Sequence, residues 1–134
     1  MITKRTARMV GLALAESARS TYDRVRIGAV VADGNYVVGR GANLCTSHPL
    51  QYRYNNKAGR DAPAHNCHAE MHAIIRACSN YSKLDGCEIF VGRYDRNGRL
   101  GMCKPCAACE LAIKEHGIIR VTYTTLQGVI TEEP

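Results

Sequence analysis

Proline is scarce in this chain, with four residues in 134, and the sequence contains no internal repeat, low-complexity tract or linker. Hydrophobic residues make up 46% of the chain, which excludes the composition of an intrinsically disordered protein. A chain of this length suits one domain that buries roughly two thirds of the surface exposed by the unfolded chain. We therefore expect a single globular domain over residues 1–134.

Long apolar runs are also missing. No stretch approaches the roughly 20 apolar residues that a membrane span needs, so we expect no membrane partner. The first residues, MITKRTARMVGLALA, have the basic and apolar parts of a secretion signal, but the apolar core has only the minimum length. We interpret this segment as a first amphipathic helix, and we expect a cytoplasmic protein.

The number of cysteines is odd. Seven are present, so a disulfide framework would leave one over. Two of them, Cys106 and Cys109, form a C-x-x-C pair. Without a convincing secretion signal, this pattern indicates a reducing compartment and a metal or redox role for the pair.

Acidic residues are outnumbered. The 18 lysines and arginines exceed the 12 aspartates and glutamates, which gives a formal net charge of +6. Such an excess favours anionic partners, from a single phosphate to a polynucleotide, and it does not choose between them. Nucleic acid is therefore an alternative partner to a small molecule.

The order of elements predicts a mixed sheet covered by helices. The patterns indicate three helices and five strands, namely helices over 3–20, 67–80 and 105–116, and strands over 24–32, 36–43, 86–93, 118–124 and 129–133. Residues 44–66 are polar, and we expect an irregular loop there. Alternating strands and helices after this loop predict parallel neighbours, whereas the first hairpin and the short last strand are antiparallel. The expected fold is α/β, a three-layer α/β/α sandwich with a mixed five-stranded sheet.

Two helix starts carry residues that can bind metal. The helix at 67–80 begins with His68 and Glu70, and the helix at 105–116 begins with Cys106 and Cys109. Ligands of open α/β sheets gather beyond the carboxyl ends of the strands, so the two helix starts should meet at one sheet edge. Helix N-termini favour thiolates, and one histidine with two thiolates leaves a fourth zinc position open for water. We expect Glu70 to take the proton of that water.

These residues resemble a known signature. H-A-E at 68–70 with P-C-A-A-C at 105–109 is similar to the cytidine deaminase superfamily of zinc nucleoside and nucleotide deaminases. The resemblance covers most of the chain, and it implies a single zinc-dependent deaminase domain with one catalytic Zn²⁺. The resemblance implies that His68, Cys106 and Cys109 bind the zinc and that Glu70 is the proton shuttle. It also implies that Asn43 contacts the sugar and that the backbone N–H of Ala69 contacts the base.

The implied reaction is hydrolytic loss of ammonia, most often at C4 of cytosine. We expect a cytosine nucleotide or nucleoside of the dCMP or cytidine type as substrate. The alternative is a polynucleotide base deaminase that acts on single-stranded DNA or tRNA. A non-catalytic zinc module is a third hypothesis, against which the intact Glu70 argues. The resemblance also favours a homo-oligomer.

Further residues are candidates for substrate contacts. In the polar segment, Tyr52 and Arg53 could stack a base and bind a phosphate, although ordinary solvent-exposed side chains would look the same. Arg93, Arg96 and Arg99 precede the cysteines and are second candidates for phosphate contacts.

The sequence leaves two other metal sites as alternatives. The C-x-x-H pair of Cys45 and His48 could form a structural zinc site with Cys67 or His65, but a lone pair of this kind is more often chance. Cys103 extends the later pair to C-x-x-C-x-x-C, as in an iron–sulfur site, but a fourth cysteine followed by proline is missing.

Overall fold

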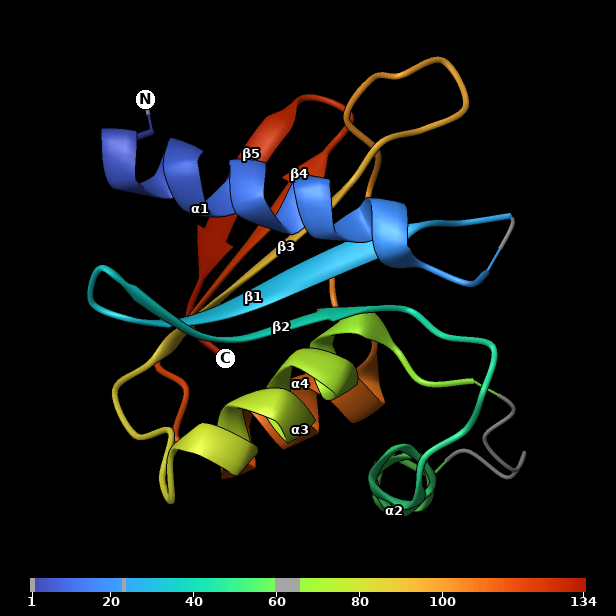
Figure 1. Ribbon diagram of the computed structural model, residues 1–134, viewed down its shortest axis with the longest axis vertical. Helices are drawn as coiled ribbons and strands as arrows, with labels where there is room; N and C mark the ends of the chain where they lie inside the picture. The colour runs from blue at the N-terminus through green and yellow to red at the C-terminus, as the bar shows by residue number, and fades with distance from the viewer. Residues whose placement is uncertain (1, 23, 60–65) are drawn as a thin grey trace.

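The computed structural model describes residues 2–22, 24–59 and 66–134, which form one five-stranded sheet with helices on both faces (Figure 1). Its strands, in chain order, are β1 (Ile27–Asp33), β2 (Tyr36–Ala42), β3 (Glu88–Arg93), β4 (Arg120–Thr125) and β5 (Gly128–Glu132). Across the sheet the order is β2-β1-β3-β4-β5.

The strand directions determine where ligands can gather. β1 is antiparallel to both β2 and β3, β3 is parallel to β4, and β5 returns antiparallel to β4. Because β1 runs opposite to both its neighbours, β2, β3 and β4 all end at the same edge of the sheet. The mixed five-stranded sheet and the antiparallel last strand are confirmed.

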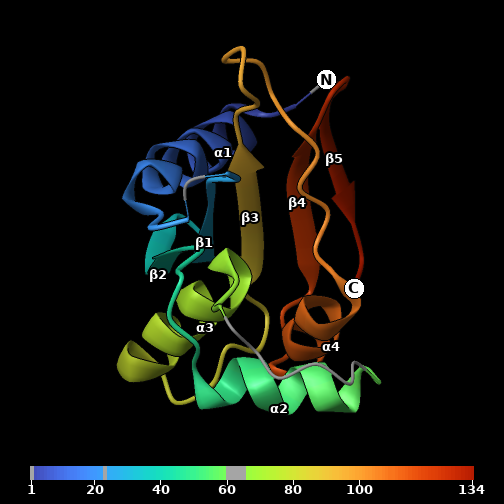
Figure 2. The same ribbon diagram turned by 90° about the vertical axis from the view of Figure 1, so that its right-hand side faces the viewer.

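The helices make the outer two layers. α1 (Lys4–Glu16) covers one face of the sheet, and a 3₁₀ turn, η1 (Ser17–Arg19), continues it. α3 (Ala69–Asn80) and α4 (Ala107–Glu115) lie side by side on the other face, as Figures 1 and 2 show. A small core lies under α1, where Met9 and Ala13 pack with Val30 and Phe90, and the larger core lies under α3 and α4. This arrangement is the expected three-layer sandwich.

Two glycines of β2 allow α3 to lie very close to the sheet. A Cβ atom at Gly39 would lie 2.5 Å from the carbonyl oxygen of Ala73, and one at Gly41 would lie 2.4 Å from the Ala73 nitrogen. Only a residue without a side chain tolerates backbone contact of this kind. The glycines therefore fix the distance between β2 and α3.

The expectation of an irregular loop over 44–66 is wrong for its middle part, which forms α2 (Pro49–Lys57). His48 caps this helix, since its Nδ1 accepts the Leu50 N–H at 3.0 Å, and Pro49 occupies the first position. The buried residues of α2 are Gln51, Tyr54 and Asn55, so the helix has no apolar stripe for a sequence pattern to reveal. Residues 60–65 lie outside the described part of the chain.

The ends of the other helices are also shifted. α3 and α4 begin at Ala69 and Ala107, two residues later than expected, and α1 gives way to the 3₁₀ turn after Glu16. His68 and Cys106 are therefore N-cap residues with extended backbone. Both side chains consequently lie at helix starts and not within helices.

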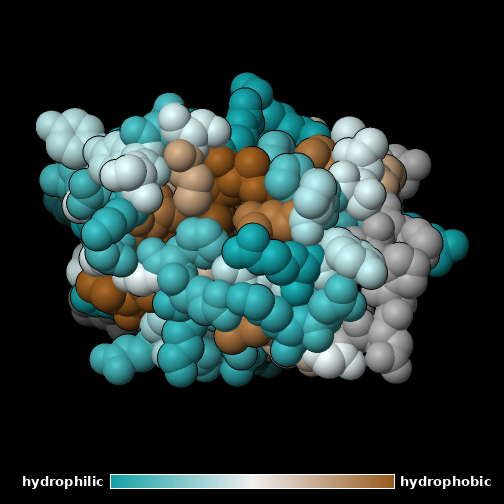
Figure 3. Space-filling model, turned by 90° about the horizontal axis from the view of Figure 1, so that it is seen from below, coloured by the Kyte–Doolittle hydropathy of each residue, from teal (hydrophilic) through white to brown (hydrophobic). Residues whose placement is uncertain are grey.

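The molecular surface on the side of α2, α3 and α4 is mainly hydrophilic, with hydrophobic side chains gathered near its centre (Figure 3). Within the described residues, no helix is both long enough and apolar enough to cross a membrane.

Candidate active site

The starts of α3 and α4 bring three metal-binding side chains together. The Nδ1 atom of His68 lies 3.4 Å from the Sγ atom of Cys106 and 3.4 Å from that of Cys109. All three ligand atoms lie within 4.8 Å of one another. A tetrahedral zinc with bonds of about 2.3 Å to sulfur and 2.05 Å to nitrogen places such atoms about 3.6 Å apart. The donor set and its spacing therefore fit zinc.

The described residues do not assemble the other metal sites that the sequence left open. Within residues 2–22, 24–59 and 66–134, the group above is the only set of three that could hold a metal. The thiol of Cys45 contacts the carbonyl oxygen of Thr21 at 2.9 Å, and Cys103 contacts the Thr124 hydroxyl at 3.1 Å. His65 lies outside the described residues. All seven cysteines are free thiols.

The two ligand thiols differ in acidity. The hydrogen bond from Cys109 lowers the pKa of Cys106 to about 3, with further help from His68 and against the effect of burial. The same shared hydrogen bond, together with burial, raises the pKa of Cys109. Cys106 is consequently the thiolate of the pair, and zinc binding must displace the proton of Cys109, because thiolates are the metal ligands.

Glu70 lies in the first turn of α3 and is almost fully buried beside the ligands. Burial raises the pKa of its carboxyl group to about 7, although the nearby His68 acts in the opposite direction. A carboxyl group with a pKa close to neutrality can accept and release a proton at physiological pH.

A cavity of about 290 Å³ opens over these groups. It is lined by six of the residues that the sequence singled out, which are Asn43, His68, Ala69, Glu70, Cys103 and Cys106. Ala69 is the first residue of α3, and the first N–H groups of a helix have no acceptor within it. The cavity therefore combines the metal ligands with an acid and a free backbone donor.

Asn43 belongs to the cavity wall, and its side chain also holds the chain before β1. Its Oδ1 accepts the Ile27 N–H at 2.9 Å, and its Nδ2 donates to the Val25 carbonyl at 2.6 Å. Ile27 and Val25 line the same cavity. One visible task of Asn43 is thus to shape this wall, and its expected sugar contact would use the remaining lone pair or N–H.

Tyr52 and Arg53 are placed elsewhere. Both lie on α2, where Tyr52 is half exposed and the Arg53 guanidinium lies 5.7 Å from the centre of the Tyr54 ring. Neither residue lines the cavity. Their contact with a base or phosphate stays a prediction.

Sequence reasoning missed one residue that positions a ligand. Gln51 is fully buried on α2, and its Oε1 accepts the backbone N–H of His68 at 2.9 Å. Its Nε2 donates to the Oδ1 of Asn55 at 2.9 Å. Directly before the histidine in the chain, Cys67 exchanges two backbone hydrogen bonds of 2.8 and 3.0 Å with Leu44. His68 is therefore held by α2 and by the segment after β2, and no motif in the sequence indicated this support.

Solved structures of other proteins share the fold of this chain. A dCMP deaminase from the cyanophage S-TIM5 is 21% identical, with a TM-score of 0.66, over 92% of this chain and 84% of that chain. A cytidine deaminase from Burkholderia pseudomallei is 19% identical, with a TM-score of 0.69, over 98% and 93%. A structure from a study of A-to-I editing by tRNA:A34 deaminases is 26% identical, with a TM-score of 0.53, over 87% and 74%. No curated protein sequence matches the chain.

The family comparison is decisive. The family model for the cytidine and deoxycytidylate deaminase zinc-binding region matches residues 3–125, which is most of the chain. That region includes the histidine and both cysteines that the structure gathers. The chain therefore belongs to the zinc-binding cytidine and deoxycytidylate deaminase family.

Proposed function

We propose that this protein is a zinc-dependent hydrolytic deaminase that converts a cytosine nucleotide or nucleoside to the uracil form with release of ammonia. The observation that carries the proposal is one cavity lined by the ligands His68 and Cys106 and by the buried acid Glu70. The third ligand, Cys109, lies behind them with its Sγ atom within 4.8 Å of both other ligand atoms. A structural zinc site would gain nothing from that acid, whereas hydrolysis needs a group that moves protons.

In this proposal each residue of the site has a defined role. Zinc held by the three ligands supplies Lewis acidity that brings the pKa of water close to 7. The Glu70 carboxylate accepts a proton from the attacking water and delivers it to the ring nitrogen N3 as the oxygen adds to C4. It then carries the second proton to the leaving amino group, so that water and cytosine give uracil and ammonia.

The cavity supplies the remaining contacts. In this proposal the N–H of Ala69 donates to the oxygen of the base and Asn43 contacts the sugar, since both residues line the cavity. Because Glu70 is almost fully buried, its electrostatic contacts with the reacting groups are less screened than they would be in bulk water. The cyanophage enzyme of similar fold has been solved with dCMP and dUMP, which supports a pyrimidine nucleotide as the ligand class.

A second candidate is deamination of a base within a polynucleotide. The similarity to a tRNA deaminase structure and the net charge of +6 favour it. Five substrates decide between the candidates: cytidine, CMP, dCMP, a single-stranded DNA and a tRNA. Release of ammonia from the polymers alone would refute the first candidate.

The catalytic assignment is tested by Glu70→Gln. We expect this variant to keep one zinc per chain and to lose about 10²–10⁴-fold in turnover, as is typical when a general acid–base group is removed. Glu133→Gln is the matched control, because Glu133 is exposed near the end of the chain. Zinc is measured by atomic absorption and ammonia by a coupled assay. Full activity of Glu70→Gln would overturn the mechanism.

A further inference from the structure

A second cavity, of about 550 Å³, lies beside the proposed active site and is rich in arginine. Four arginines line it, two from the segment before β1 and two from the end of β3 and the loop after it, and we call them the arginine groove: Arg24, Arg26, Arg93 and Arg96. The proposed mechanism uses none of these residues.

The groove adjoins the active-site cavity. Val25 lines both cavities, and its carbonyl is the group that Asn43 holds at 2.6 Å. On the opposite side, Arg93 donates from its Nη1 to the carbonyl oxygen of Met102 at 3.3 Å, and Met102 also lines the active-site cavity. The two cavities therefore adjoin at Val25, and a ligand in the active site could extend past this residue into the groove.

Among the described residues that line the groove, four are arginines and one, Asp95, is an acid. The Oδ1 of that carboxylate already accepts the backbone N–H groups of Asn97 and Arg99 at 2.8 and 3.0 Å. In the described part of the chain, the Nε atom of Arg93 is the one buried side-chain nitrogen or oxygen without a hydrogen-bond partner. A buried guanidinium N–H without an acceptor is costly, so Arg93 is held beside the groove at the expense of fold stability.

We propose that the arginine groove binds the phosphate of the substrate, so that the enzyme prefers a phosphorylated cytosine substrate to the free nucleoside. Guanidinium groups match phosphate oxygens with paired N–H donors, which explains why arginines would gather here. A mononucleotide and a nucleotide within a strand offer the same chemistry. This inference rests on the proposed deaminase function and names the substrate class of that site.

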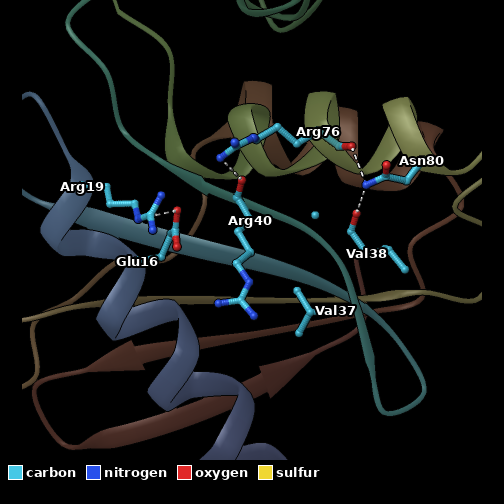
Figure 4. A pocket seen from close by; sticks show the side chains of 8 residues that line it. Glu16, Arg19, Val37, Val38, Arg40, Arg76 and Asn80 are labelled. Carbon is cyan, nitrogen blue, oxygen red and sulfur yellow. Dashed lines mark hydrogen bonds and ion pairs between the residues drawn. The ribbon is translucent and has the colours of Figure 1, made fainter.

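Another arginine-lined hollow on the molecule does not adjoin the active-site cavity (Figure 4). There Arg19 lies 3.8 Å from the carboxylate of Glu16, and Arg76 donates to the carbonyl oxygen of Arg40 at 3.5 Å. This hollow shares no lining residue with the active-site cavity. It therefore supplies a control position, since Arg40 is exposed and matches the groove arginines in charge.

The test compares Arg24→Glu and Arg96→Glu with the control Arg40→Glu. The kcat/KM is measured for deoxycytidine, for dCMP and for a short single-stranded DNA with one cytosine. We expect each groove variant to lower the kcat/KM ratio of dCMP to deoxycytidine by about tenfold or more, and the control to leave this ratio unchanged. A steep loss of activity with salt on the DNA alone would identify a strand as the source of the phosphate.

A binding measurement separates this inference from the proposed function. Calorimetry compares dUMP with deoxyuridine on the wild-type protein and on the same variants. Tighter binding of dUMP that is lost in the groove variants supports the groove, even if no substrate releases ammonia and the deaminase proposal fails. Turnover of deoxycytidine together with equal affinity for dUMP and deoxyuridine would overturn the groove and leave the deaminase intact.

Discussion

Replacement of Gln51 by leucine is expected to damage the metal centre from a distance. The side chain is fully buried, and it accepts the His68 N–H and donates to Asn55. Leucine has a similar size but no polar atoms, so both partners lose their hydrogen bond. Each orphaned group costs about 1–3 kcal/mol, and because the His68 bond is only partly buried we expect about 2–4 kcal/mol in total.

That loss has two measurable consequences. With a urea dependence of about 1–3 kcal/mol/M, the unfolding midpoint should fall by about 0.7–4 M urea. The zinc affinity should fall by about 10–100-fold, as for other residues that orient a ligand. Urea titration followed by circular dichroism measures the first effect, and competition with a chromophoric chelator measures the second.

Two further variants make the Gln51 test specific. Gln51→Glu keeps an acceptor for the His68 N–H, so it should retain more zinc affinity than the leucine variant at a comparable loss of stability. Gln127→Leu removes an exposed glutamine in the turn between β4 and β5 and should change neither quantity. Equal midpoints and equal zinc affinities for Gln51→Leu and Gln127→Leu would refute the reasoning.

Three other outcomes are expected. Gly41→Ala should destabilise the fold by about 1–3 kcal/mol or prevent folding, because its Cβ atom would meet the backbone of α3. The control Gly11→Ala has open space around its Cβ atom and should not destabilise the fold, and thermal unfolding measures both variants. Cys106→Ser should abolish stoichiometric zinc while Cys78→Ser, at an exposed cysteine, keeps it, as elemental analysis would show. The homo-oligomer stays a prediction, for which light scattering after gel filtration should give a mass above 14.7 kDa; a monomer at every concentration would contradict it.

The metal centre was accessible from the sequence for a physical reason. β2 and β3 end at the same edge of the sheet, and α3 and α4 follow them in the chain. The starts of these helices therefore lie together, so His68 and Cys106 meet although they are distant in the chain. The residue types then define the chemistry, since an imidazole and two thiols are soft zinc ligands.

Two features could not be foreseen in the same way. α2 buries polar side chains such as Gln51 and Asn55, and hydrophobic periodicity does not detect a helix whose inner face is polar. The arginine groove joins Arg26 and Arg93, which are far apart in sequence, through the β1–β3 register that pairs Ile27 with Arg93. A register between distant strands depends on tertiary pairing, so the grouping became visible only in the folded chain.

The two edge strands of the sheet, β2 and β5, differ in how easily a strand of another chain could pair with them. On the outer side of β2, Arg76 and Asn80 donate to the carbonyl oxygens of Arg40 and Val38. An incoming strand would have to displace these side chains before it could pair there. Strand addition by a neighbouring copy would therefore meet less competition at the opposite rim, along β5.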